Sequence, residues 1–178
     1  FFSEGDTEVL LKAYHAWGER FVEKLNGMFA FAIRESATGR VLLGRDRLGI
    51  KPLYYELTDE RLRFASSLPA VVAAGGVDTA VDPVALHHYM TFHAVVPAPH
   101  TILRGVRKLP PATLMTVEPD GSTRLNKYWS VDFNARPDEA NLSFEDWQDR
   151  VLEALGAAIN RRMVADVPVG VLLSGGLD

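Results

Sequence analysis

The chain contains the segment Val169-Gly170-Val171-Leu172-Leu173-Ser174-Gly175-Gly176-Leu177-Asp178, in which a short apolar run leads directly into two glycines. An apolar run of this length, bounded by turn residues, is typical of a buried parallel strand. The glycines let the backbone bend and expose its N–H groups, which favours phosphate binding. We therefore predict the start of a doubly wound α/β domain, with a nucleotide site at residues 174–178.

The polar groups of this segment have separate predicted roles. Ser174 would donate its hydroxyl to a phosphate, and Gly175 and Gly176 would donate their N–H groups. The Asp178 carboxylate repels phosphate, so we predict that it binds Mg²⁺. The lysine and the longer spacing of a Walker loop are missing, and a turn that binds no ligand is the alternative interpretation.

A long helix is predicted before this segment. Ser143-Phe144-Glu145-Asp146 has the pattern of a capping box, and Pro168 prevents continuation of the helix. One apolar stripe follows at helical spacing: Phe144, Trp147, Val151, Leu155, Ala158, Ile159 and Met163. The polar composition of residues 130–141 indicates a linker. We predict two domains, residues 1–136 and residues 137–178.

A helical segment also opens the chain. Residues 6–25 carry apolar side chains at helical spacing, and Gly18 is expected to split them into two helices. Asp6 has two interpretations: it is the N-cap of the first helix, or its carboxylate binds the ammonium group of a ligand. Spacing alone leaves both open.

Short strands dominate the remainder of the N-terminal part. The predicted hairpins pair residues 28–34 with 40–44, 52–57 with 61–66, and 113–117 with 122–129. Residues 28–34 are apolar on both faces, so we expect layers to cover both sides of this strand. Helices are predicted at residues 68–74 and, after the start signal Asp82-Pro83, at residues 84–90. The fold class is therefore α+β, followed by the start of an α/β domain.

The run Arg45 to Tyr55 combines charges, glycine and aromatic side chains. We interpret it as a structural loop in which Arg45 and Asp46 form an ion pair. Gly49 and Pro52 are expected to determine the turn.

Composition excludes several classes of function. The 178 residues are 47% apolar, enough for a core, and a net charge of −4 with no basic stripe argues against nucleic-acid binding. The apolar runs are too short to cross a bilayer, and no leader segment is recognised. We therefore expect a cytoplasmic protein without membrane contact. The chain has no cysteine, which excludes disulfides, thiolate metal sites and thiol nucleophiles within it.

Taken together, these stretches resemble the glutamine-hydrolysing asparagine synthetase family, and the likeness covers nearly the whole chain. The matching residues are Gly5 to Leu10, Asn26 to Ala32, Gly44 to Tyr55, Phe64-Ala65-Ser66, Val96 to Pro99, Lys108 to Pro111, Tyr128-Trp129 and Asp166 to Asp178.

The resemblance implies a two-domain carbon–nitrogen ligase. An N-terminal-nucleophile glutaminase domain, an αββα sandwich, releases ammonia from glutamine. A synthetase domain of the adenine-nucleotide α-hydrolase type uses ATP and Mg²⁺ to convert a carboxylate, such as that of aspartate, into an acyl-adenylate. Ammonia passes through a tunnel and displaces AMP, which gives an amide, with pyrophosphate as the other product. The assembly as a monomer or a homodimer stays open.

The resemblance also assigns roles to matched positions. Asp6 would bind the α-amino group of glutamine. Leu172 and Leu173, with Ser174, Gly175, Gly176 and Asp178, would form the ATP and pyrophosphate site. The family nucleophile is an N-terminal cysteine whose own amino group acts as base, and Phe1 cannot replace it. The resemblance therefore implies an inactive fragment with no catalytic residue of its own.

Several alternatives remain. Residues 87–97 are similar to a branch that amidates N-acetylglutaminylglutamine, and Ser67 replaces a common glutamate, so the acceptor is open. A non-catalytic binding module and a relative of β-lactam synthetase are the other two hypotheses.

Overall fold

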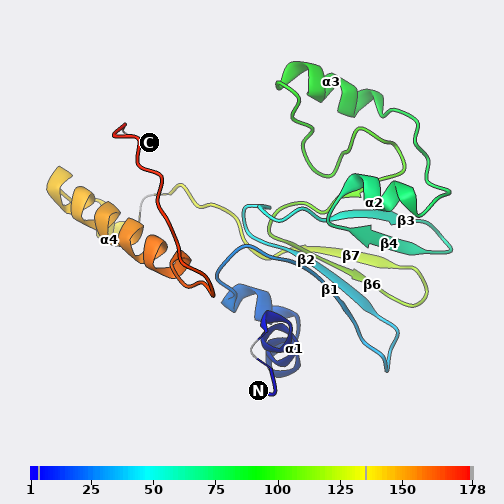
Figure 1. The fold of residues 1–178 in the computed structure, drawn as a ribbon, viewed down its shortest axis with the longest axis horizontal. Coiled ribbons are helices and arrows are strands. Elements are labelled where there is room, and N and C mark those ends of the chain that lie inside the picture. The colour runs from blue at the N-terminus through cyan, green and yellow to red at the C-terminus, as the bar shows by residue number, and fades with distance from the viewer. Residues whose placement is uncertain (4, 135, 177–178) are drawn as a thin grey trace. The chain divides into compact units, whose positions relative to one another are not determined.

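The computed structural model describes residues 1–3, 5–134 and 136–176. Contacts between Cα atoms divide the chain into two compact units, Phe1–Val131 and Asp132–Asp178 (Figure 1). The domain boundary predicted between residues 136 and 137 stays a prediction. We describe each unit separately.

The first unit begins with two consecutive helices. The α-helix α1 spans Asp6–Trp17, and the 3₁₀ helix η1 spans Gly18–Lys24. Gly18 has a φ of +56°, a conformation that only glycine adopts at little cost, and its N–H closes the last turn of α1. The prediction that Gly18 divides this helical segment is confirmed.

Four antiparallel strands form the first sheet. They are β1 (Ala30–Arg34), β2 (Val41–Arg45), β6 (Thr113–Val117) and β7 (Thr123–Lys127), in the order β1-β2-β6-β7. The predicted hairpins β1–β2 and β6–β7 are both confirmed, with Phe31 opposite Gly44 and Met115 opposite Leu125. The β2–β6 pairing joins segments about 70 residues apart, which the sequence pattern did not reveal.

Three antiparallel strands form the second sheet. They are β3 (Tyr54–Leu57), β4 (Leu62–Ala65) and β5 (Arg107–Lys108), in the order β4-β3-β5. The predicted hairpin β3–β4 is confirmed.

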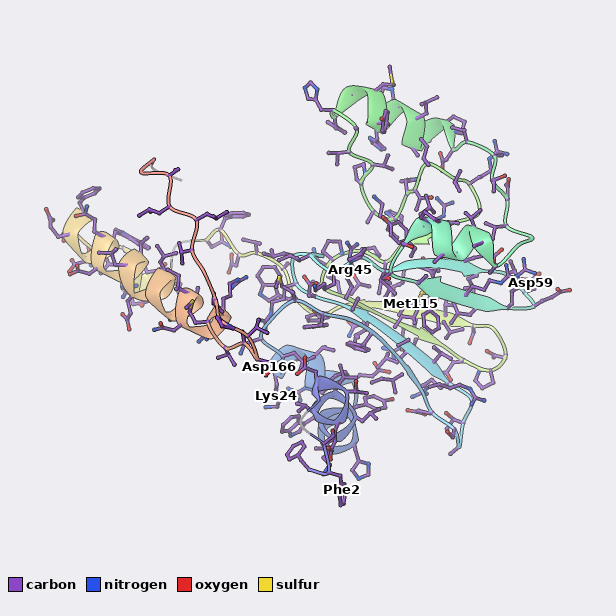
Figure 2. All side chains as sticks on the ribbon, viewed as in Figure 1. Phe2, Lys24, Arg45, Asp59, Met115 and Asp166 are labelled. Atoms are coloured by element: carbon purple, nitrogen blue, oxygen red, sulfur yellow. The ribbon has the colours of Figure 1, made fainter. Side chains whose placement is uncertain are left out.

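The first sheet is covered by different layers on its two faces. Leu42 of β2 packs with Phe21 and Val22 of η1, whereas the next residue, Leu43, packs with Leu53 and Tyr55 of the second sheet region. This alternation follows from the two-residue period of a strand. Figure 1 shows α1 on one side of the first sheet, and Figure 2 labels Met115 of β6, which belongs to the same cluster as Leu43 and Tyr55.

The prediction that residues 28–34 are covered on both faces holds at the start of β1, where Ala30 packs on one core and Phe31 on the other, but it is wrong for the end of the strand. The strand within them, β1, lies at the outside of the sheet order, and its Ala32 and Arg34 are exposed. The inner strands β2 and β6 are the ones buried on both faces. The apolar composition of a strand does not reveal its place in the sheet order, so it did not identify the inner strands.

Two short helices follow the second sheet's hairpin. The helix α2 (Leu68–Ala73) contacts β3 and β4. The helix α3 (Pro83–Thr91) starts where Asp82-Pro83 predicted: the Asp82 carboxylate accepts hydrogen bonds from the N–H groups of Val84 and Ala85.

The second unit contains a 3₁₀ turn, η2 (Pro137–Glu139), and a long helix, α4 (Phe144–Arg162). The predicted capping box is confirmed, since the Ser143 hydroxyl accepts from the N–H of Asp146 and the Asp146 carboxylate accepts from the N–H of Ser143. Within the part of the chain that the structure describes, no helix is both long enough and apolar enough to cross a membrane.

The predicted strand at residues 169–173 is absent. This segment is irregular, and Leu172 is fully exposed. A strand is stable only when its backbone groups pair with a neighbouring strand, and the described residues of the second unit contain none.

Candidate functional site

A cavity of about 520 Å³ lies in the first unit, beside the start of α1 and the strand β1. This volume is within the range of pockets that hold small molecules. Its polar lining residues are Asp6, Thr7, Lys51 and Ser66. Its apolar lining residues are Leu10, Met28, Phe29, Ala30, Phe31, Ala32 and Pro52.

Asp6 is the first residue of α1 and lies in the wall of this cavity. The interpretation of Asp6 as N-cap is wrong: Gly5 is the N-cap, with extended backbone and no side-chain cap bond. Among the described residues, no hydrogen bond or ion pair engages the Asp6 carboxylate. A carboxylate in the first turn of a helix interacts favourably with the helix dipole.

The segment that leads into α1 is held by Glu8. The Glu8 carboxylate accepts from the N–H groups of Phe2 at 2.8 Å and Ser3 at 2.6 Å, and it forms an ion pair with Lys12 at 3.1 Å. Desolvation opposes the charge of Glu8, but the donors from Phe2 and Ser3 together lower the pKa of its carboxyl below the ordinary value. This contact fixes the chain on the N-terminal side of Asp6.

Another part of the cavity wall comes from the loop after β2. The predicted ion pair between Arg45 and Asp46 is not formed among the described residues; each side chain binds backbone groups instead. The Arg45 guanidinium donates to the carbonyl oxygens of Gly49 and Lys51, at 2.6 and 2.8 Å. The wider interpretation of this run as a structural loop is confirmed, and the loop places Lys51 and Pro52 in the cavity wall.

The lining residues carry both signs of charge. Asp6 supplies a negative charge, Lys51 supplies a positive charge, and Thr7 and Ser66 supply hydroxyl groups. An amino acid carries an ammonium group and a carboxylate that would complement the two charged side chains. Because the chain has no cysteine, the wall contains no thiol nucleophile.

Sequence reasoning missed part of this site. Thr7 and Ser66 belong to stretches that carried the family resemblance, yet neither received a role. Lys51 was placed in a structural loop only. Thr7, Lys51 and Ser66 are recognised as site residues because they line the same cavity as Asp6. That placement depends on pairings between distant segments, which the sequence pattern does not show.

The second candidate site lies in the other unit. Ser174, Gly175 and Gly176 form an exposed bend, in which Gly175 has a φ of +80° and the Ser174 hydroxyl accepts from the N–H of Gly176 at 3.2 Å. Leu172 and Leu173 precede the bend without secondary structure. The predicted Mg²⁺ ligand, Asp178, lies outside the described residues, and its role stays a prediction.

No metal centre accompanies either site within residues 1–3, 5–134 and 136–176: groups of three or more His, Asp or Glu side chains suited to a metal ion do not occur there.

Comparison with known proteins finds two matching families and several relatives. Residues 1–129 match the family described as glutamine amidotransferase domain, and residues 150–178 match the family described as asparagine synthase. Two relatives from Bacillus subtilis are glutamine-hydrolyzing asparagine synthetase 1, 37% identical over 179 residues, and synthetase 3, 34% identical over 178 residues. An amidase, chry2 of Gibberella zeae, is 28% identical over 178 residues.

All three alignments cover 100% of this chain but only 26–28% of each relative. The chain thus spans about a quarter of the length of these curated relatives. Three findings support the same family: the match over residues 1–129, the two antiparallel sheets in that region, and relatives above 30% identity. The chain belongs to the glutamine-hydrolysing asparagine synthetase family, and residues 1–129 are its glutamine amidotransferase domain.

Proposed function

We propose that this chain is part of a glutamine-dependent amidotransferase of the asparagine synthetase type, and that the cavity beside Asp6 binds glutamine. The observation that carries the proposal is the pairing of Asp6 and Lys51 in one cavity of about 520 Å³ within the glutamine amidotransferase domain. Asp6 binds the α-ammonium group of glutamine by a charge-assisted hydrogen bond. We also propose that the layers around the first sheet belong to an αββα glutaminase sandwich.

In the proposed reaction, water and glutamine give glutamate and ammonia, and ammonia attacks an activated carboxylate to form an amide. ATP, when bound, supplies the adenylyl group that turns a poor acyl donor into a good one. The exposed Ser174–Gly176 bend supports phosphate binding, because Gly175 carries no side chain that would block approach to its N–H group. Ser174, Gly175 and Gly176 would hold the pyrophosphate part, and Asp178 would hold Mg²⁺.

The acceptor carboxylate has two candidates. Aspartate is favoured by the names of the two Bacillus subtilis relatives. N-Acetylglutaminylglutamine is favoured by the sequence of residues 87–97, which form most of α3 and the loop that follows. Relatives of this chain carry different names, since the protein named amidase chry2 aligns with the whole chain at 28% identity.

Isotope transfer tests this proposal. The full-length protein is incubated with ATP, Mg²⁺, glutamine labelled with ¹⁵N in its side-chain amide, and either acceptor. We expect ¹⁵N in the new amide of one acceptor, together with AMP and pyrophosphate. Labelled glutamine that stays intact in both reactions would contradict the proposal and favour a non-catalytic module. Pyrophosphate exchange without glutamine hydrolysis would instead favour a relative of β-lactam synthetase.

A further inference from the structure

The carboxylate of Asp46 is buried and serves as a common acceptor for four backbone N–H groups. The side chain is only 1% exposed. Its Oδ1 atom accepts from Leu48 at 3.2 Å and Ile50 at 2.9 Å. Its Oδ2 atom accepts from Lys51 at 2.9 Å and Phe29 at 3.3 Å. These contacts join the start of β1 to the loop that follows β2.

Two of these four donors belong to the wall of the cavity. Phe29 and Lys51 both line it, together with Asp6. The main chain reinforces the link, since the N–H of Asp46 donates to the carbonyl of Phe29 at 2.9 Å. A single carboxylate therefore sets the spacing between two parts of the wall that are 22 residues apart in sequence (Phe29 to Lys51).

Arg45 binds the carbonyl groups of the same loop. Its guanidinium donates to the carbonyls of Gly49, Lys51 and Leu109 at 2.6, 2.8 and 2.6 Å. Asp46 thus binds the N–H groups of the loop, while Arg45 binds its carbonyl groups. Figure 2 labels Arg45, which lies inside the first unit. A loop held at both kinds of backbone group has little freedom to shift.

We propose that Asp46 is a positioning residue for the glutamine pocket: its buried carboxylate fixes Phe29 and Lys51 in the wall that also contains Asp6. This inference rests on the proposed function. Asp46 does not line the cavity, so it acts through the backbone that it holds. A misplacement of about 1 Å that arises away from the reacting atoms can lower the reaction rate by about a hundredfold.

The substitution Asp46→Asn tests this role in the full-length protein. Asparagine keeps the volume, but its NH₂ group would face N–H donors that now lack an acceptor. We expect the KM for glutamine to rise by about tenfold or more, with a smaller fall in kcat. Amide formation from free ammonia should stay within about twofold of the unmodified protein, because that reaction does not use the pocket.

Asp82→Asn is the matched control. Asp82 is also a buried carboxylate that accepts from two backbone N–H groups, those of Val84 and Ala85, but it does not line the cavity. We expect its KM for glutamine to be unchanged. Should Asp46→Asn not fold, Arg45→Lys is the second variant, because lysine keeps the charge and loses the fork that holds Gly49 and Lys51. Arg45→Lys should also raise the KM for glutamine.

Three results would overturn the inference. The first is an unchanged KM in a folded Asp46→Asn protein, or in Arg45→Lys where Asp46→Asn does not fold. The second is an equal rise in KM in Asp82→Asn, and the third is an equal loss of glutamine-dependent and ammonia-dependent activity. Failure of the unmodified protein to hydrolyse glutamine would overturn the proposed function, and this inference with it. Hydrolysis by the unmodified protein separates the two cases.

Discussion

The hydroxyl of Tyr128 donates a hydrogen bond to the carbonyl of Arg45 at 2.8 Å, next to the loop that forms the cavity wall. Burial of the phenol, with the negative charge of Asp46 adding to it, raises the pKa of Tyr128 to about 12. The folded state therefore favours the protonated phenol. The stabilising contribution of the protonated Tyr128 phenol is complete below the pKa of an unfolded tyrosine, about 10. It is lost as the pH rises through about 12.

We predict that the free energy of unfolding of the unmodified protein falls between about pH 10 and pH 12 by about 1 kcal/mol more than that of Tyr128→Phe. Phenylalanine lacks the ionising group, so this part of the pH dependence disappears. Urea unfolding at several alkaline pH values measures it. Equal slopes in the two proteins would show that Tyr128 ionises alike in the folded and unfolded states.

At the scale of elements, the β1–β2 hairpin depends on an aromatic ring placed over a glycine. Phe31 lies opposite Gly44, and an ideal Cβ at Gly44 would overlap the Phe31 ring. The same ring lies 5.3 Å from the ring of Phe21, between centroids, and it lines the cavity. Gly44 therefore provides the space that lets Phe31 pack under η1.

We predict that Gly44→Ala destabilises the protein by about 1–3 kcal/mol, because the methyl group would displace the Phe31 ring. In a Phe31→Ala background the same substitution should cost less than about 1 kcal/mol, since the ring is gone. Chemical unfolding of the four proteins of this double-mutant cycle gives the coupling. An equal cost in both backgrounds would show that Phe31 does not require a glycine at position 44.

Local patterns predicted the elements that local chemistry determines. The split at Gly18, the N-cap at Asp82 and the capping box at Ser143 were predicted because each depends on residues within four positions of one another. Hairpins were predicted for the same reason, since their strands and turns are adjacent in sequence.

Features that depend on distant segments were not predicted. Neither the inner position of β2 nor its pairing with β6 follows from the apolar pattern of either strand. The partners of Arg45 include the carbonyl of Leu109, 64 residues away. An ion pair with its neighbour Asp46 was therefore the wrong expectation. Asp6 was identified through family resemblance, whereas Lys51 reached the site only through the geometry of its loop.

At the scale of the whole molecule, the chain consists of two units that match different families. The first unit carries the glutamine amidotransferase match and the cavity, and the second carries α4 and the bend at Ser174–Gly176. In the proposed function, free ammonia enters the amide-forming reaction directly. We therefore predict that damage to the glutamine pocket spares amide formation from free ammonia.

Kinetics of Asp6→Asn in the full-length protein test the central claim, that the cavity beside Asp6 binds glutamine. Loss of the charge should weaken a charge-assisted hydrogen bond to the substrate ammonium group, so we predict a rise of about 10- to 100-fold in the KM for glutamine. The control is Asp59→Asn, an exposed carboxylate in the β3–β4 turn, labelled in Figure 2. It should match the unmodified protein. Amide formation from free ammonia should be retained in both variants. An unchanged KM for glutamine in Asp6→Asn, or an equal loss of activity with glutamine and with ammonia, would contradict the claim.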